Sequence, residues 1–236
     1  MPSTSSIFQQ QEGDACRWIT AQEFREVEEG IRERGFPTET ELHATYIDIR
    51  NALDYGNIDF AVVGGYAMNA YGIKRKTYDV DFYFNATDEH IFGVLRALPV
   101  IAIRNGLGTS TDSFRVHFVL STGVVVGVDF HRVPIDLRLG SRKSVIVLDD
   151  KETRTLTSTG LVNSKLRRFH SRRKTGLPTL QDEEDIYLLI TGLISVEDVH
   201  QLNRNFLAKE FLPACRLSSE QKEAIRDLIC PEGIDD

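Results

Sequence analysis

Residues 62–84, VVGGYAMNAYGIKRKTYDVDFYF, decide the fold of this chain. The first residues of this stretch belong to an apolar run, IDFAVVGG at 58–65, which is typical of a buried strand that ends in two glycines. The next segment, YAMNAYG at 66–72, predicts a short helix packed on that strand. The alternating β-branched and aromatic residues of YDVDFYF at 78–84 predict a second strand.

Asp79 and Asp81 share one face of this second strand, because residues i and i+2 project from the same side, about 7 Å apart. Val80, Phe82 and Phe84 take the opposite face and are apolar. Two neighbouring carboxylates are costly without a partner, and a divalent cation compensates for that cost. Oxygen ligands at this separation suit Mg²⁺ or Mn²⁺, which also bind substrate phosphates.

Gly64 and Gly65 lie where the first strand gives way to the helix. Glycines let the backbone approach an anion closely, and a helix N-terminus directs N–H groups toward it. A Gly-Gly pair or an Asp-x-Asp alone is common by chance. In this order and spacing, the two predict a phosphate-binding turn beside a metal site.

The stretch resembles the minimal nucleotidyltransferases of the DNA-polymerase-β-like superfamily, whose signature is a hydrophobic strand, Gly-Gly or Gly-Ser, and then Asp-x-Asp. It is closest to the branch of toxin and antitoxin nucleotidyltransferases, where a Gly, an Arg and a Thr or Ser precede Asp-x-Asp, as Gly72, Arg75 and Thr77 do here. The match covers residues 58–132, with a looser one in LVNSKLRRF and DEEDIYLL farther along. Tyr66 departs from the pattern, because many relatives carry a small or hydroxyl residue there.

The resemblance implies an enzyme that moves a nucleoside monophosphate from a nucleoside triphosphate to a hydroxyl acceptor and releases pyrophosphate, with Mg²⁺ or Mn²⁺ as cofactor. It implies a set of catalytic and metal-binding carboxylates: Asp79, Asp81 and, as the third candidate, Asp129. It also implies a set of nucleotide-binding residues: Gly64, Gly65, Tyr66, Arg75, Thr77 and Lys165.

Two interpretations of Asp129 stay open. Residues 113–120 and 124–132 predict a hairpin, and symmetric pairing about Thr122 places Asp129 opposite Arg115. Asp129 then either joins the other two aspartates around the metals or forms a cross-strand ion pair with Arg115. Two histidines share this face, within reach of a substrate: His117 and His131.

The whole sequence predicts a mixed α/β (α+β) fold, a sheet flanked by helices with a helical C-terminal region. The expected regions are a mobile tail and helix pair at 1–56, a nucleotidyltransferase-like core at 57–155 and helices at 156–236. Helix starts are expected at Ser or Thr residues followed by acidic residues or Gln, as in a capping box: Thr20, Thr38, Thr179 and Ser218. The helices are expected at 20–34, 38–56, 88–97, 158–174, 180–193, 195–211 and 218–230, and further strands at 98–103 and 144–148.

The composition narrows the class of protein. The chain is 41% hydrophobic, so it can bury a core, and its net charge of −7 excludes a protein that coats nucleic acid by bulk charge. Three separated cysteines disfavour a disulfide scaffold or zinc ribbon and suit a reducing, cytoplasmic location. No apolar run approaches the ~18 residues of a membrane span, so no membrane partner is expected.

Residues 165–174, KLRRFHSRRK, form a basic stretch that is either a solvated helix face or a site for RNA phosphates. The candidate RNA-binding residues besides Lys165 are Arg167, Arg168, Arg172, Arg173 and Lys174. Two alternative functions follow: a fold repurposed for tRNA- or RNA-dependent group transfer, such as aminoacyl transfer, and a nucleotide-binding module without catalysis. The intact Asp-x-Asp disfavours the second alternative. The acceptor, the base and the oligomeric state are left open.

Overall fold

The computed structural model describes residues 17–18, 22, 25–26, 29–30, 35–98, 100–105, 113–133, 143–148 and 151–230. The chain forms two compact units, one within 1–69 and 74–155 and the other within 70–73 and 156–236. The helix expected at 20–34 lies largely outside the described residues. Among the described helices, none is long and apolar enough to cross a membrane.

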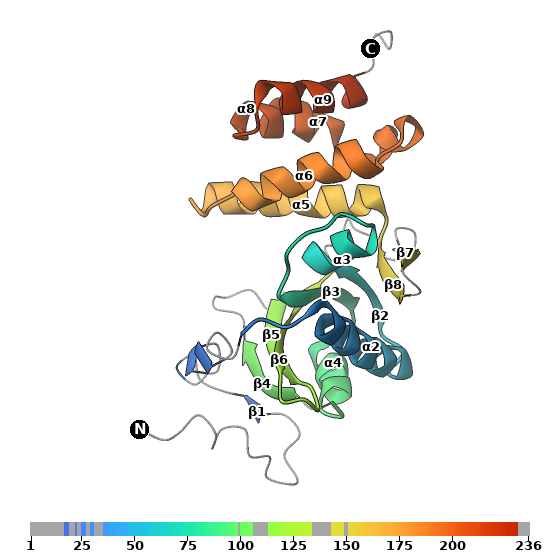
Figure 1. Cartoon of the computed structure of the whole chain (residues 1–236), viewed down its shortest axis with the longest axis vertical. Helices are drawn as coiled ribbons and strands as arrows, with labels where there is room; N and C mark the ends of the chain where they lie inside the picture. Colours follow the sequence, from blue (N-terminus) through green and yellow to red (C-terminus); the bar gives the residue numbers. More distant parts are fainter. Residues whose placement is uncertain are drawn as a thin grey trace. The chain divides into compact units, whose positions relative to one another are not determined.

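The first unit is built on a mixed sheet whose strands, in the described residues, follow the order β1-β4-β5-β6-β3-β2-β8-β7 (Figure 1). β3 runs antiparallel to β2 and parallel to β6, and β6 runs antiparallel to β5. The predicted class, a mixed sheet flanked by helices, is confirmed. The strands are β1 Arg17–Trp18, β2 Asp59–Val63, β3 Asp79–Asn85, β4 Val100–Asn105, β5 Ser113–Val119, β6 Val125–Arg132, β7 Lys143–Leu148 and β8 Lys151–Leu156.

Helices α2 (Glu39–Tyr55) and α4 (Asp88–Leu95) lie together over the sheet (Figure 1). α2 begins with the predicted capping box: the Thr38 N–H donates to the Glu41 carboxylate at 2.7 Å, and the Thr38 hydroxyl accepts from the Glu41 N–H. Beneath these helices, the face of β3 that was predicted to be apolar is fully buried: Val80, Phe82 and Phe84. The other face of β3 carries Asp79 and Asp81, as the alternation requires.

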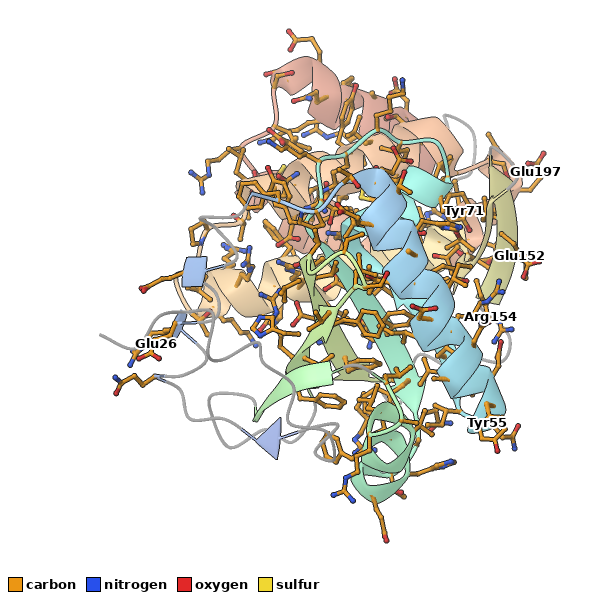
Figure 2. All side chains as sticks on the ribbon, turned by 60° about the horizontal axis from the view of Figure 1, so that its bottom comes forward. Glu26, Tyr55, Tyr71, Glu152, Arg154 and Glu197 are labelled. Carbon is orange, nitrogen blue, oxygen red and sulfur yellow. The ribbon has the colours of Figure 1, made fainter. Side chains whose placement is uncertain are left out.

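β8 is a strand that the sequence pattern did not reveal. It runs parallel to β2, with Val62 paired to Thr155, and the Thr155 hydroxyl donates to the Val62 carbonyl at 2.9 Å. The Arg154 N–H donates to the Tyr46 hydroxyl at 2.8 Å, which ties the strand to α2, and Figure 2 shows Arg154 on β8 near this helix. The sequence of β8 lacks a hydrophobic pattern, because its buried side chains include Thr153 and Thr155.

The second unit is helical, with α5 at Ser158–Lys174, α6 at Leu180–Leu193 and α9 at Ser219–Ile229, in agreement with the predicted ranges. α5 packs along α6, and α6 packs on α9 (Figure 1). The helix start expected at Thr179 is confirmed, because Thr179 is the N-cap residue of α6. Its side chain makes no cap hydrogen bond, however, and donates instead to Glu183 Oε1 at 2.7 Å.

The single helix expected at 195–211 is also wrong. The extended backbone of Leu202 interrupts it, and Asn203 starts a new helix by accepting from the Phe206 N–H at 3.1 Å. Short pieces replace the predicted helix: 3₁₀-helix η3 Val196–Gln201, α7 Arg204–Phe206, π-helical η4 Leu207–Phe211 and, beyond the range, α8 Leu212–Ala214.

Candidate active site

Three aspartates meet on one face of the sheet. Asp79 and Asp81 come from β3, and the parallel β6 places Asp129 directly beside Asp81 in the strand register. One carboxylate oxygen from each of the three lies within 4.8 Å of the other two. The three side chains are partly buried, so they form a concentrated patch of oxygen ligands.

The electrostatics of this triad favour a cation. Burial raises the pKa of Asp79 above its usual value, and the charges of Asp81 and Asp129 raise it further. The Arg115 guanidinium and a hydrogen bond from Thr77 oppose this rise in the Asp79 pKa. An all-oxygen donor set that is desolvated and self-repelling fits Mg²⁺ or Mn²⁺.

Arg115 contacts two of the three carboxylates. Its Nε and Nη2 donate to the two oxygens of Asp129, at 2.7 and 2.6 Å, and Nη2 also donates to Asp79 Oδ2 at 2.9 Å. The predicted pairing of Arg115 with Asp129 across the hairpin is confirmed. The ion-pair interpretation of Asp129 is therefore confirmed. Asp129 also lies in the triad, and its role around metals stays a prediction. The contact to Asp79 was missed, since it depends on the β3–β6 register.

Gly64 and Gly65 open helix α3 (Gly64–Ala70), and both positions exclude a side chain. Gly64 has a φ of +69°, and a Cβ there would overlap the Asp81 carboxylate, at 2.8 Å from its Cγ. A Cβ on Gly65 would overlap the Arg75 guanidinium and lie 2.8 Å from Thr77 Oγ1. The two glycines thus let the backbone lie directly against the triad and against the segment that leads into β3.

Arg75 and Thr77 are held in place by local hydrogen bonds. Thr77 Oγ1 donates to Asp79 Oδ1 at 3.1 Å, which orients this carboxylate. Asn69 Oδ1 accepts from the Arg75 N–H at 2.7 Å and fixes the loop. Sequence reasoning missed Asn69, whose one signal is its position as a polar residue in a short, mostly apolar helix.

Tyr66 was expected to contact the nucleotide, but the structure buries its side chain away from solvent. Its ring is buried against Tyr46, with ring centroids 5.5 Å apart, and its hydroxyl lies 2.7 Å from His43 Nδ1. Burial raises the pKa of Tyr66 far above its usual value. The first turn of α3 directs Tyr66 toward α2, so this ring belongs to the core.

The two histidines on the sheet face that carries the three aspartates differ in their solvent exposure. His131 Nε2 lies 3.7 Å from Asp81 Oδ1, and its side chain is half-exposed. His117 is 1% exposed, and burial followed by the charge of Arg115 lowers its pKa to about 4. His117 is therefore a neutral, buried side chain, whereas His131 is accessible to a ligand.

Lys165 is buried within the helical unit in a network of ion pairs. Its Nζ lies 2.6 Å from Asp185 Oδ2 and 3.6 Å from Asp182 Oδ1. Arg168 and Arg172 reach the same Asp182, at 3.5 and 3.7 Å. This face of the basic stretch is thus compensated by the acidic residues Asp182 and Asp185 of α6.

The remaining cations of the basic stretch lie elsewhere on α5. Arg173 Nη1 is 3.9 Å from Glu210 Oε2, Arg167 is half-buried, and Lys174 is exposed. Of these three cations, Arg173 and Lys174 at the C-terminal end of α5 are exposed, and RNA binding by them stays a prediction.

Comparisons with known proteins address the fold. No protein-family model matches the sequence, and no curated protein sequence is similar to it. An antigenic nucleotidyltransferase-like protein from Paracoccidioides brasiliensis is similar in structure, with a TM-score of 0.50 and 17% identity over 79% of this chain and 94% of that one. The chain has a nucleotidyltransferase-like fold.

The solution structure of the antibiotic-resistance factor ANT(2'')-Ia is a second match, with a TM-score of 0.53 and 17% identity over 73% of this chain and 94% of that chain. At such identity the likeness establishes the nucleotidyltransferase-like fold, and fold alone does not define an activity. Function therefore has to be argued from the carboxylate triad and its surroundings.

Proposed function

We propose that this chain is a metal-dependent nucleotidyltransferase that transfers a nucleoside monophosphate from a nucleoside triphosphate to a hydroxyl acceptor and releases pyrophosphate. The observation that carries the proposal is the convergence of Asp79, Asp81 and Asp129 within 4.8 Å, next to two glycines that cannot be substituted without displacing their neighbours. The nucleotidyltransferase-like fold supports the proposal, because it presents this site on its central strands.

A divalent cation held by Asp79, Asp81 and Asp129 would stabilise the negative charge that develops on the phosphate oxygens during transfer. Thr77 keeps the Asp79 carboxylate oriented toward the site. Gly64 and Gly65 allow the triphosphate to approach the backbone. Arg75, whose guanidinium lies against Gly65, is positioned to bind a phosphate oxygen with its charged N–H groups.

The proposed reaction is an in-line displacement. The acceptor oxygen forms a bond to the α-phosphorus, and the bond from this phosphorus to the bridging oxygen breaks, so that pyrophosphate leaves with the electron pair. The hydroxyl proton passes to the Asp129 carboxylate, which faces the other two aspartates and is oriented by Arg115.

The charge distribution favours an acceptor other than a long polynucleotide. Lys165, Arg168 and Arg172 are already paired with acidic residues of α6, so few cations of the basic stretch are left for RNA phosphates. Membership of the toxin and antitoxin branch and RNA-dependent group transfer both stay predictions. The label-transfer experiment described next tests them.

The proposal is tested by label transfer from each α-³²P nucleoside triphosphate in Mg²⁺ or Mn²⁺, with total tRNA, a cell extract or the protein itself as acceptor. We expect label in one acceptor class. Asp81→Asn should reduce transfer by at least about 100-fold, because even residues that support metal ligands contribute 10–100-fold. The exposed Asp48 of α2 provides the matched control, and Asp48→Asn should transfer at the wild-type rate.

Thermal melting separates a catalytic from a structural role of Asp81. Asp81→Asn should melt at the wild-type temperature or above it in metal-free buffer, because one carboxylate of a crowded triad is neutralised. Transfer by Asp81→Asn at the wild-type rate would refute the proposal. Retention of tRNA at low salt with no label transferred would favour RNA-dependent group transfer instead.

A further inference from the structure

Arg115 occupies a position among the carboxylates that a cation would take. A single nitrogen, Nη2, lies 2.9 Å from Asp79 Oδ2 and 2.6 Å from Asp129 Oδ2, and so bridges two of the three carboxylates. Nε adds a third hydrogen bond, at 2.7 Å, to the other oxygen of Asp129. Such a bidentate, charge-assisted contact holds both side chains in a defined geometry.

The order and register of the strands determine the path of the Arg115 side chain. Arg115 lies on β5, and its guanidinium crosses β6 to reach Asp79 on β3. It crosses at Gly127, the register partner of Asp79, where an added Cβ would lie 3.7 Å from Arg115 Cζ, in ordinary van der Waals contact. A larger side chain at residue 127 would fill this path, so the glycine and the arginine act together.

Charge balance gives this contact a consequence for metal loading. The three carboxylates carry three negative charges, and Arg115 compensates for one of them. One divalent cation then neutralises the set, whereas a second would have to bind beside both a guanidinium and the first cation. Like charges at such short range repel strongly, because the site is partly buried.

We propose that Arg115 is a resident cation of the carboxylate triad, which holds Asp79 and Asp129 together and limits the nucleotide-free protein to one divalent cation. The inference rests on the proposed function, in which the triad binds a metal. It adds to that function that the Arg115 side chain occupies the position that a second metal ion would otherwise take. Arg115 is then a positioning residue of the triad.

The test is Mn²⁺ binding to the whole, nucleotide-free chain, counted by electron paramagnetic resonance of the unbound ion. We expect one Mn²⁺ per wild-type chain. Arg115→Met should bind a second Mn²⁺, or bind the first at least about 10-fold more tightly, because one positive charge is gone. Arg115→Lys keeps the charge and should stay at one ion.

Two further variants keep the test decisive. Gly127→Val leaves the charge of Arg115 in place but blocks its path to Asp79, and it should raise Mn²⁺ uptake as Arg115→Met does. Arg154→Met is the matched control, because Arg154 pairs with Asp54 at 2.7 Å instead of the triad, and its Mn²⁺ binding should equal that of the wild type.

Thermal melting gives an independent readout. In EDTA, Arg115→Met should melt below the wild type, because three carboxylates lose their counter-ion, and Mn²⁺ should restore much of the loss. Wild-type and Arg115→Met chains that bind the same number of ions with equal affinity would overturn the role of Arg115 and leave the proposed function intact. If neither chain binds Mn²⁺, both the role of Arg115 and the metal dependence of the proposed function fail.

Discussion

Gly64→Ala is the substitution that separates backbone strain from damage to the carboxylate triad. Gly64 has a φ of +69°, and a Cβ there would overlap Asp81, at 2.8 Å from its Cγ. Gly123, in the turn between β5 and β6, has a φ of +80° with nothing within 4 Å of its Cβ position. Gly123→Ala therefore carries the same kind of strain without the collision, and serves as the matched control.

The structure sets the size of the expected effects. A left-handed backbone costs an alanine about 1–2 kcal/mol, so both variants should lose this amount of unfolding free energy. Gly64→Ala should lose about 1 kcal/mol more, because Asp81 is forced away from its preferred rotamer. Carbon atoms prefer separations of about 3.5–4.0 Å, so the Asp81 carboxylate has to move by on the order of 1 Å. Such a displacement of a catalytic group lowers turnover by about 100-fold.

Urea unfolding, Mn²⁺ binding and label transfer measure these effects together. Gly64→Ala should lose Mn²⁺ affinity and transfer, whereas Gly123→Ala should keep both although its left-handed backbone also lowers its stability. Equal Mn²⁺ affinity and equal transfer in the two variants would refute the reasoning, because Gly64 would then serve the turn alone and not the position of Asp81.

Two further predictions concern buried ionisable groups. His117 is buried with a pKa lowered to about 4, so the folded state binds fewer protons than the unfolded state between about pH 4 and 6.5. The free energy of unfolding should therefore fall as the pH drops through this range, by up to about 3 kcal/mol. In urea titrations, His117→Gln should flatten this pH dependence. An unchanged pH dependence would contradict the burial of a neutral imidazole. Lys165→Met should cost about 3–5 kcal/mol of unfolding free energy, because it leaves Asp185 charged and buried, whereas the exposed Lys174→Met should change stability by less than about 0.5 kcal/mol. Equal stability of the two lysine variants would show that the buried ion pair contributes little.

Local patterns predicted most of the fold. The apolar run before Gly64, the alternation in β3 and the capping boxes at Thr38 and Ser218 depend on neighbouring residues, and the structure contains each of them. The hairpin register that pairs Arg115 with Asp129 was also predictable, because a short turn leaves few ways to align its two strands.

What the sequence left undetermined depends on residues far apart in the chain. Lys165 was expected at a phosphate, but its Asp185 partner comes from the next helix, and helix packing brings the two together. Tyr66 follows the glycines in sequence, yet the direction of α3 turns it toward His43 and the core. The second contact of Arg115, to Asp79, needs a strand register that no local pattern contains.

The most direct test of the central claim is a diffraction experiment on crystals grown with Mn²⁺ and a non-hydrolysable nucleoside triphosphate, measured at the manganese absorption edge. The account predicts an anomalous peak on the order of 2 Å from carboxylate oxygens of Asp79 and Asp81, with the triphosphate against Gly64 and Gly65. A bound nucleotide elsewhere on the chain, with no manganese at these aspartates, would contradict it.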